Sequence, residues 1–192
     1  VLSLSEVFQP PSFKHPLGTD YLGRDTLSRL LYGARISIYA SIFVVVLTVL
    51  IGLPIGAVSG YLGGKADETL MRITDIIMSF PGITLAMLIS YAMGRGVFGA
   101  GLALSAVGWT SMARIVRGVV LSEKEKDYVV AARVLGKNNF RILFGEVVPN
   151  CLYPVVVDAM MRMGTTIIAL AGLSFIGVGV QPPNPDWGIM VS

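Results

Sequence analysis

The sequence carries little charge for its length. Asp, Glu, Lys and Arg make up 14% of its 192 residues, against about 25% in a soluble domain. Hydrophobic residues make up 54% of the chain, and its mean hydropathy is +0.72. A soluble domain of this size could not bury so much apolar surface, so we expect lipid to be the solvent for much of the chain.

Cysteine and histidine are almost absent. Cys151 is the only cysteine and His15 the only histidine, which excludes an internal disulfide and a cysteine-based metal cluster. His15 lies in a Pro-rich polar stretch, which favours a role in a loop over catalysis. The net charge is only +3 and the basic residues are dispersed. We therefore predict no catalytic residue, no metal site and no nucleic-acid surface.

A complete ATP-binding motif is also missing. Gly63-Gly64-Lys65 comes nearest to a P-loop. However, Ser59 stands where the first glycine is required, and Ala66 stands where a Ser or Thr would bind Mg²⁺. The chain is therefore expected to bind no cofactor and to hydrolyse no ATP.

Long apolar segments are what the sequence does contain. A spanning helix needs about 20 predominantly apolar residues, and the segments that qualify are 36–60, 69–93, 97–115 and 152–178. Pro54 is expected to kink the first span, and Pro81-Gly82 lies near the middle of the second. Residues 1–35 are expected to form a polar loop with an amphipathic lead-in. Residues 36–192 are then one all-α transmembrane domain with four spans.

The first span contains Gly52, Gly56 and Gly60 at four-residue spacing. Small residues at this spacing let two membrane helices approach closely. Glycine is also simply more frequent in membrane helices than in soluble ones. The sequence leaves both interpretations open.

Few charged residues fall within the predicted spans. Asp158 and Arg162 lie four residues apart in the last span, where they can pair on one helix face. Each is costly in lipid, by ~2.5–3.5 kcal/mol on insertion scales. They either satisfy each other at a helix–helix contact, or they line a transport pathway and meet zwitterionic substrates. Asp75, near the start of the second span, is expected to pair with Arg72.

A charged segment separates the third and fourth spans. Residues 114–146 carry eleven charged residues and cannot cross a membrane. Ser122 and Glu125 have the spacing of a capping box. A helix is therefore expected to begin there and to end at Gly136, since glycine is typical just after a helix.

A second short helix is expected to begin at Asn138 or Asn139. Its apolar residues recur at i, i+3, i+4 and i+7, which predicts one apolar face. The residues of this face are Phe140, Leu143, Phe144 and Val147. Pro149 either ends this helix or marks the start of the last span.

The distribution of Lys and Arg predicts the orientation. With four spans, the loops at 61–71 and 114–149 share one side, which holds nine Lys and Arg residues when Arg72, next to the first loop, is included. Residues 1–35, the turn near Arg95 and the C-terminal tail share the other side, which holds five. Because cytoplasmic loops are enriched in Lys and Arg, the loop at 116–149 is expected in the cytoplasm and residues 1–35 outside.

Residues 127–136 read DYVVAARVLG, and Pro149 follows them at a fixed distance. This pattern resembles the EAA loop of ABC importer permeases, a helix–turn–helix that docks into a groove on the ATPase subunit. The resemblance implies that coupling to the ATPase rests on Asp127, Tyr128, Ala131, Ala132, Arg133, Leu135, Gly136 and Pro149.

Within this loop, Ala131 and Ala132 would give a slim helix face that sits deep in the groove, and Gly136 would allow the tight turn. Two positions depart from the family pattern. Val130 replaces the usual glutamate, and Glu146 stands where an aliphatic residue is common. These departures change the polar contacts expected with the ATPase, but they leave the Ala-Ala, Gly and Pro skeleton intact.

Other segments resemble the oligopeptide/dipeptide/nickel permease group of these importers. They are HPLGTD at 15–20, GRD at 23–25, Ser28-Arg29, Gly33-Ala34-Arg35, SFP at 79–81, Ala113-Arg114, Arg117-Gly118, LSFIG at 173–177, QPP at 181–183 and Trp187-Gly188. This resemblance covers nearly the whole chain. A full subunit of that group has six spanning helices, which implies that this chain lacks the first helix, the last helix and the cytoplasmic N-terminus.

The resemblance implies a type I ABC importer transmembrane fold and a multi-pass permease subunit in the cell inner membrane, importing di- or oligopeptides. The implied partners are a second homologous permease subunit, two ATPase subunits that bind ATP and Mg, an extracytoplasmic substrate-binding protein and the lipid bilayer. Nickel chelates and glutathione-like peptides are alternative substrates. An ion-coupled secondary transporter or channel would need no ATPase-docking loop. An intramembrane enzyme would need a catalytic set that the lone His15 and Cys151 do not provide.

Overall fold

The computed structural model describes residues 6–181 and 183–191. Within this range the chain is helical and contains no β-strand, which confirms the predicted all-α class. The elements are α1 (Thr26–Leu62), α2 (Gly64–Met78), α3 (Gly82–Met93), α4 (Val97–Glu123), α5 (Asp127–Val134), α6 (Asn139–Ile142), the π turn η2 (Leu143–Val147), α7 (Val148–Phe175) and α8 (Trp187–Val191). Residues 1–5 of the predicted loop, Pro182 of the QPP motif and Ser192 lie outside the described residues.

The long helix α1 begins after Asp25, whose carboxylate accepts a hydrogen bond from the Ser28 backbone N–H at 2.7 Å. This is the usual way in which aspartate caps a first turn. α1 starts well before the predicted span 36–60 and continues as helix through Pro54. Its 37 residues make it about 55 Å long at about 1.5 Å per residue. It is therefore longer than the hydrocarbon core of a bilayer, which is about 30 Å thick.

The predicted second span, 69–93, is not one straight helix. α2 and α3 meet at an angle of 85°, and the break falls at Ser79–Pro81. Pro81 has no N–H to continue a helix, and its ring disfavours helical geometry at Phe80. The prediction of a single helix was therefore wrong, although the proline responsible was visible in the sequence.

Among the described residues, two helical stretches are long and apolar enough to cross a membrane by themselves. They are α1, which contains an 18-residue segment with a mean hydropathy of 2.6, and Asn139–Phe175, in which the corresponding value is 1.5. The bent pair α2–α3 would make a third. α4, which contains the predicted span 97–115, is not among them, because much of it is Gly, Ala, Ser and Thr. These small residues let α4 lie buried against α1, α3 and α7.

The three spaced glycines of α1 form a close contact with α4. A Cβ on Gly56 would lie 2.3 Å from the Ala113 carbonyl oxygen, and one on Gly60 would lie 2.8 Å from the Arg117 carbonyl oxygen. A Cβ on Gly52 would lie 2.7 Å from the Met112 side chain. The interpretation of this spacing as a close helix approach is therefore confirmed.

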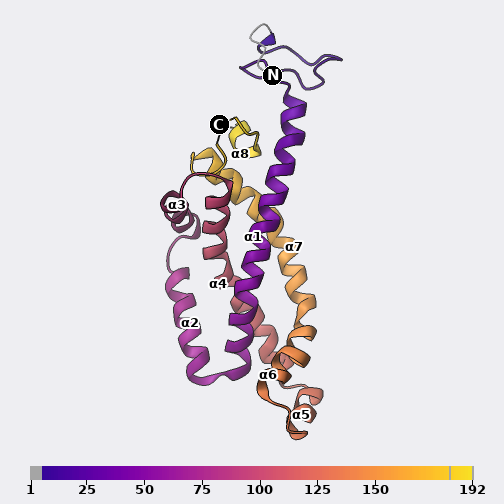
Figure 1. Cartoon of the computed structure of the whole chain (residues 1–192), viewed down its shortest axis with the longest axis vertical. Helices are drawn as coiled ribbons and strands as arrows, with labels where there is room; N and C mark the ends of the chain where they lie inside the picture. Colours follow the sequence, from indigo (N-terminus) through magenta and orange to yellow (C-terminus); the bar gives the residue numbers. More distant parts are fainter. Residues whose placement is uncertain (1–5, 182, 192) are drawn as a thin grey trace.

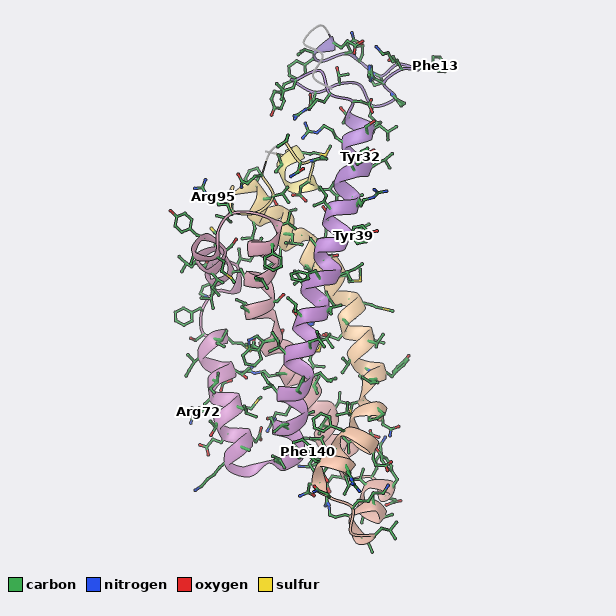
Figure 2. The ribbon with its side chains drawn as sticks, in the orientation of Figure 1. Phe13, Tyr32, Tyr39, Arg72, Arg95 and Phe140 are labelled. Atoms are coloured by element: carbon green, nitrogen blue, oxygen red, sulfur yellow. The ribbon has the colours of Figure 1, made fainter. Side chains whose placement is uncertain are left out.

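The loops gather at the two ends of the bundle (Figure 1). The N-terminal segment, the turn between α3 and α4, and α8 lie toward one end. The turn between α1 and α2 lies at the other end, together with α5 and α6. Figure 2 shows Arg95 toward the first end and Phe140 at the second. The distribution of Lys and Arg predicts that the second end faces the cytoplasm.

Candidate functional site

The charged segment forms a helical hairpin, α5 and α6, at the end of the bundle away from the N-terminal segment (Figure 1). The helix start expected at Ser122 is wrong, because α4 continues through this residue to Glu123. α5 begins instead at Asp127, after Lys126 in an extended conformation. The first residues of the predicted loop 116–149 therefore belong to α4, and the hairpin is shorter than the sequence suggested.

Glu123 joins the hairpin to α4. Its side chain is nearly buried, and its Oε1 accepts a hydrogen bond from the Tyr128 hydroxyl at 2.7 Å. Its Oε2 lies 2.8 Å from Lys126 Nζ. The hydrogen bonds from Lys126 and Tyr128 lower the pKa of Glu123, while burial and the Glu123 carboxylate raise the pKa of Tyr128 to about 12. Around neutral pH the carboxylate is therefore ionised and the phenol protonated, which is the arrangement this hydrogen bond requires.

α5 presents different residues to its two sides. Val129 and Ala132 are 0% and 5% exposed and belong to a core cluster that also contains Tyr61 and Val147. Ala131, by contrast, is exposed. The predicted slim face of Ala131 and Ala132 is therefore divided: only Ala131 is accessible to a partner, whereas Ala132 lets α5 lie close to the chain's own core.

Gly136 makes the turn between α5 and α6, as predicted. Its φ is +74°, and its N–H donates to the Arg133 carbonyl oxygen at 3.0 Å. The Lys137 N–H donates to the Ala132 carbonyl oxygen at 3.2 Å. These two bonds form a Schellman motif, which ends a helix with a residue in the left-handed region. α6 then begins at Asn139, because the Asn138 side chain accepts a hydrogen bond from the Phe140 N–H at 3.0 Å.

The residues that were expected to share one apolar face after Asn139 do not share it. Leu143 and Val147 are buried at 3% and 0% exposure, whereas Phe140 and Phe144 are 68% and 41% exposed. The two phenyl rings lie 5.5 Å apart on the outside. The reason is the π turn η2 at Leu143–Val147, which breaks the helical period on which the prediction relied.

The hairpin carries an exposed apolar surface on an otherwise charged segment. It consists of four large side chains, Val134, Leu135, Phe140 and Phe144, which we call the coupling surface. Val134 and Leu135 are 82% and 79% exposed. The other predicted coupling residues differ in their exposure. Asp127, Arg133, Gly136 and Pro149 are exposed, and Tyr128 is half-buried against the core.

A second candidate site lies in the bundle. Asp158 and Arg162 pair on α7 as the sequence allowed, and Arg162 Nη1 also donates to the Ser111 hydroxyl on α4 at 2.9 Å. Arg162 lines a cavity of about 400 Å³, whose other polar lining residues include Thr48, Thr165 and Thr166. The pair is therefore neither fully exposed nor isolated: it joins two helices, and Arg162 borders a mainly apolar space that also holds three threonine side chains. Sequence reasoning missed Ser111, because nothing local marks a partner 51 residues away.

Ion pairs also connect α2 to α4. Arg117 holds the Asp67 carboxylate with two hydrogen bonds of 2.6 Å. Asp75 pairs with Arg114, not with Arg72 as predicted. The spacing within one helix suggested Arg72 as the partner of Asp75. The antiparallel packing of α2 on α4 brings Arg114 to Asp75 instead.

The N-terminal segment uses its polar motif residues for its own structure. His15 Nδ1 lies 3.0 Å from Asp25 Oδ1, which joins the loop to the cap of α1. Gly18 has φ +73°, and a Cβ there would lie 2.5 Å from the Gln9 carbonyl oxygen. His15 therefore lies in a loop, as predicted.

A model of the family described as "Binding-protein-dependent transport system inner membrane component" matches residues 52–192. The glutathione transport system permease protein GsiD of Pectobacterium atrosepticum is 43% identical over 95% of this chain. The oligopeptide transport system permease protein OppC of Bacillus subtilis is 42% identical over 96%, and the dipeptide transport system permease protein DppC of the same organism is 40% identical over 99%. The chain spans 60%, 60% and 59% of the length of these three relatives.

A solved structure of the MetNI methionine ABC transporter in inward-facing conformations contains a similar chain. The match has a TM-score of 0.71 at 21% identity and covers 80% of this chain and 77% of that chain. At this identity the likeness shows the fold alone, and that fold is the one expected from the sequence.

Proposed function

Because this chain belongs to the family of binding-protein-dependent transport system inner membrane components, we propose that it is the core of a permease subunit in an ATP-driven importer of di- and oligopeptides. The observation that carries the proposal is the hairpin of α5 and α6, which exposes the coupling surface at one end of a membrane bundle. The names of the relatives support peptides as the substrate class, with a glutathione-like peptide as the alternative favoured by the match to GsiD.

The partners follow from this proposal. A second homologous permease subunit would complete the pathway, and two ATPase subunits would bind ATP and Mg²⁺. A substrate-binding protein outside the membrane would deliver the peptide. This chain would contribute no catalysis of its own, and its part in the cycle would be mechanical.

The packing of the hairpin suggests how movement is transmitted. Val129 and Ala132 fix α5 to the core, and Glu123 fixes its start to α4. The glycine contacts then hold α4 against α1 at backbone distance. A displacement of the hairpin by closing ATPases would therefore move α4 and α1 together, and the helices would alternate between inward-open and outward-open arrangements.

The direct test is retention of the ATPase. The full-length subunit, co-expressed with its partners, should co-purify with the ATPase and support ATP-dependent peptide uptake. Leu135→Asp should reduce ATPase retention about tenfold, because it places a charge at the centre of an apolar contact. Phe13→Asp is the matched control, since Phe13 is fully exposed on the N-terminal segment at the other end of the molecule (Figure 2). Equal retention by both variants would contradict docking through the coupling surface.

We also propose that the hairpin lies in the cytoplasm and the N-terminal segment outside. The support is the nine-to-five distribution of Lys and Arg. In a Cys151→Ala background, an impermeant thiol reagent added to spheroplasts, which lack the outer membrane, should label Phe13→Cys but not Glu125→Cys. Labelling of Glu125→Cys alone would reverse the orientation.

Asp158 and Arg162 are proposed to stabilise the bundle and to border the substrate pathway. The single variants Asp158→Asn and Arg162→Gln should each lower the membrane abundance, because one charge is left without its partner in a low-dielectric setting. The double variant should recover most of the abundance, while peptide uptake stays about fivefold below normal. The matched control is the pair of Asp75→Asn and Arg114→Gln at an exposed ion pair. Normal uptake of several peptides by the double variant would eliminate the pathway role.

A further inference from the structure

A single π turn separates the coupling hairpin from α7. The Val148 N–H donates to the Leu143 carbonyl oxygen, five residues back instead of four. On either side of this turn the helix is α-helical, and Asn139–Phe175 runs as one stretch. A π turn takes up an extra residue, so the residues before it are rotated by about 100° relative to an unbroken α-helix.

Two neighbouring residues account for this turn. Pro149 has no N–H to donate to the Gly145 carbonyl oxygen, and a proline ring clashes with the carbonyl four residues before it. Asn150 Nδ2 donates to the next carbonyl oxygen, that of Glu146, at 2.6 Å. The Glu146 carboxylate in turn lies 2.6 Å from Lys137 Nζ, at the start of the hairpin's second half. The proline leaves the Gly145 carbonyl without its α-helical donor, and the Asn150 carboxamide binds the neighbouring carbonyl of Glu146.

The turn decides which side chains face outward. In an unbroken α-helix, Phe144 would lie on the same side as Val148, Cys151 and Val155, because it precedes them by 4, 7 and 11 residues. These three residues are buried, at 9%, 0% and 2% exposure.

Ile142 would lie on the opposite side of such a helix, near Glu146 and Tyr153, and Tyr153 is 80% exposed. The structure has the reverse arrangement, with Ile142 at 0% exposure and Phe144 at 41%.

We propose that Pro149 and Asn150 are positioning residues for coupling: they hold the π turn that turns Phe144 outward to the ATPase and Ile142 inward. The proposal rests on the proposed function, since it assumes that the coupling surface meets an ATPase. It also assigns a physical role to Pro149, which is not one of the four side chains of the coupling surface.

The first experiment tests the turn without the ATPase. Phe144→Cys and Ile142→Cys are placed separately in the full-length subunit with Cys151→Ala, expressed with its permease partner but without ATPase, and labelled with a maleimide in permeabilised membranes. Phe144→Cys should react at least tenfold faster than Ile142→Cys. Adding Pro149→Ala, which restores the missing N–H, should bring the two rates within threefold or reverse them. Equal rates with Pro149 in place would overturn the proposal.

The second experiment uses the complete importer. Pro149→Ala and Asn150→Ala should each lower the peptide taken up per ATP hydrolysed about fivefold at unchanged membrane abundance, which a purely structural role would not do. Asn150→Ala should have less than a twofold further effect in the Pro149→Ala background, because the π turn that its carboxamide supports is already lost there. If Pro149→Ala changes the labelling rates but leaves the peptide taken up per ATP hydrolysed unchanged, the positioning role is overturned. Failure of the unmodified subunit to retain any ATPase would instead overturn the proposed function.

Discussion

Replacing Gly136 by proline is expected to abolish ATP-driven uptake while the subunit stays inserted in the membrane. The residue has φ +74°, whereas proline is fixed near −65°. Proline would also remove the N–H that donates to the Arg133 carbonyl oxygen at 3.0 Å. The turn between α5 and α6 would therefore be lost, and with it the alignment of Leu135 with Phe140 on the coupling surface. Uptake and ATPase pull-down should both fall more than tenfold.

Gly136→Ala provides the graded comparison. It keeps the N–H, meets no atom within 4 Å, and adds only the strain of a left-handed alanine, about 1–2 kcal/mol. It should therefore retain a measurable part of the uptake. Gly164→Ala is the control in α7, where a Cβ also meets no neighbour and φ is not positive. Unchanged uptake with Gly136→Pro would contradict the assignment of the hairpin as the coupling element.

The second large effect is expected at Gly56. Its missing side chain lets α1 lie on the Ala113 carbonyl, which would be 2.3 Å from a Cβ. The neighbour is backbone and cannot rotate away, so the two helices would have to separate. Overpacking of this kind typically costs about 1–3 kcal/mol, and occasionally more. Gly56→Leu should reduce the folded subunit in the membrane more than tenfold, and Gly56→Ala should reduce it severalfold.

Folded amount is measured as detergent-stable, monodisperse protein in the membrane fraction, with Gly164→Ala again as the control. Comparing Gly56→Ala with Gly164→Ala also tests whether the close contact at Gly56 stabilises the bundle. If Gly56→Ala has no more effect than Gly164→Ala, the close approach of α1 and α4 does not stabilise the bundle.

Features that depend on a few neighbouring residues could be predicted from the sequence. Gly136 ends α5 and Asn138 caps α6, because both act through backbone bonds within one or two turns. The apolar stretches of α1 and α7 and the all-α class were equally readable, since lipid requires long runs of apolar residues. The coupling loop was recognised as a pattern, and the chain belongs to the family that this pattern indicated.

Local reasoning failed where two local signals competed. Ser122 has the spacing of a capping box, but α4 is already helical there and needs no new start. The bend at Ser79–Pro81 was missed because hydropathy averages over a window that one proline hardly changes. The outward position of Phe144 was missed for a related reason: a period of 3.6 assumes an unbroken helix, and Pro149 interrupts it.

The sequence by itself determined the membrane class and the helical hairpin, and it placed Asp158 and Arg162 where they can pair, because each follows from composition or from residues within a few positions. Tertiary structure alone decided which partners Asp75, Arg162 and the three spaced glycines of α1 meet on other helices. Arg114 and not Arg72 pairs with Asp75, and Ser111 joins Arg162, because packing of helices distant in sequence brings these groups together. Such contacts depend on how whole helices cross, and no short stretch of sequence encodes that crossing.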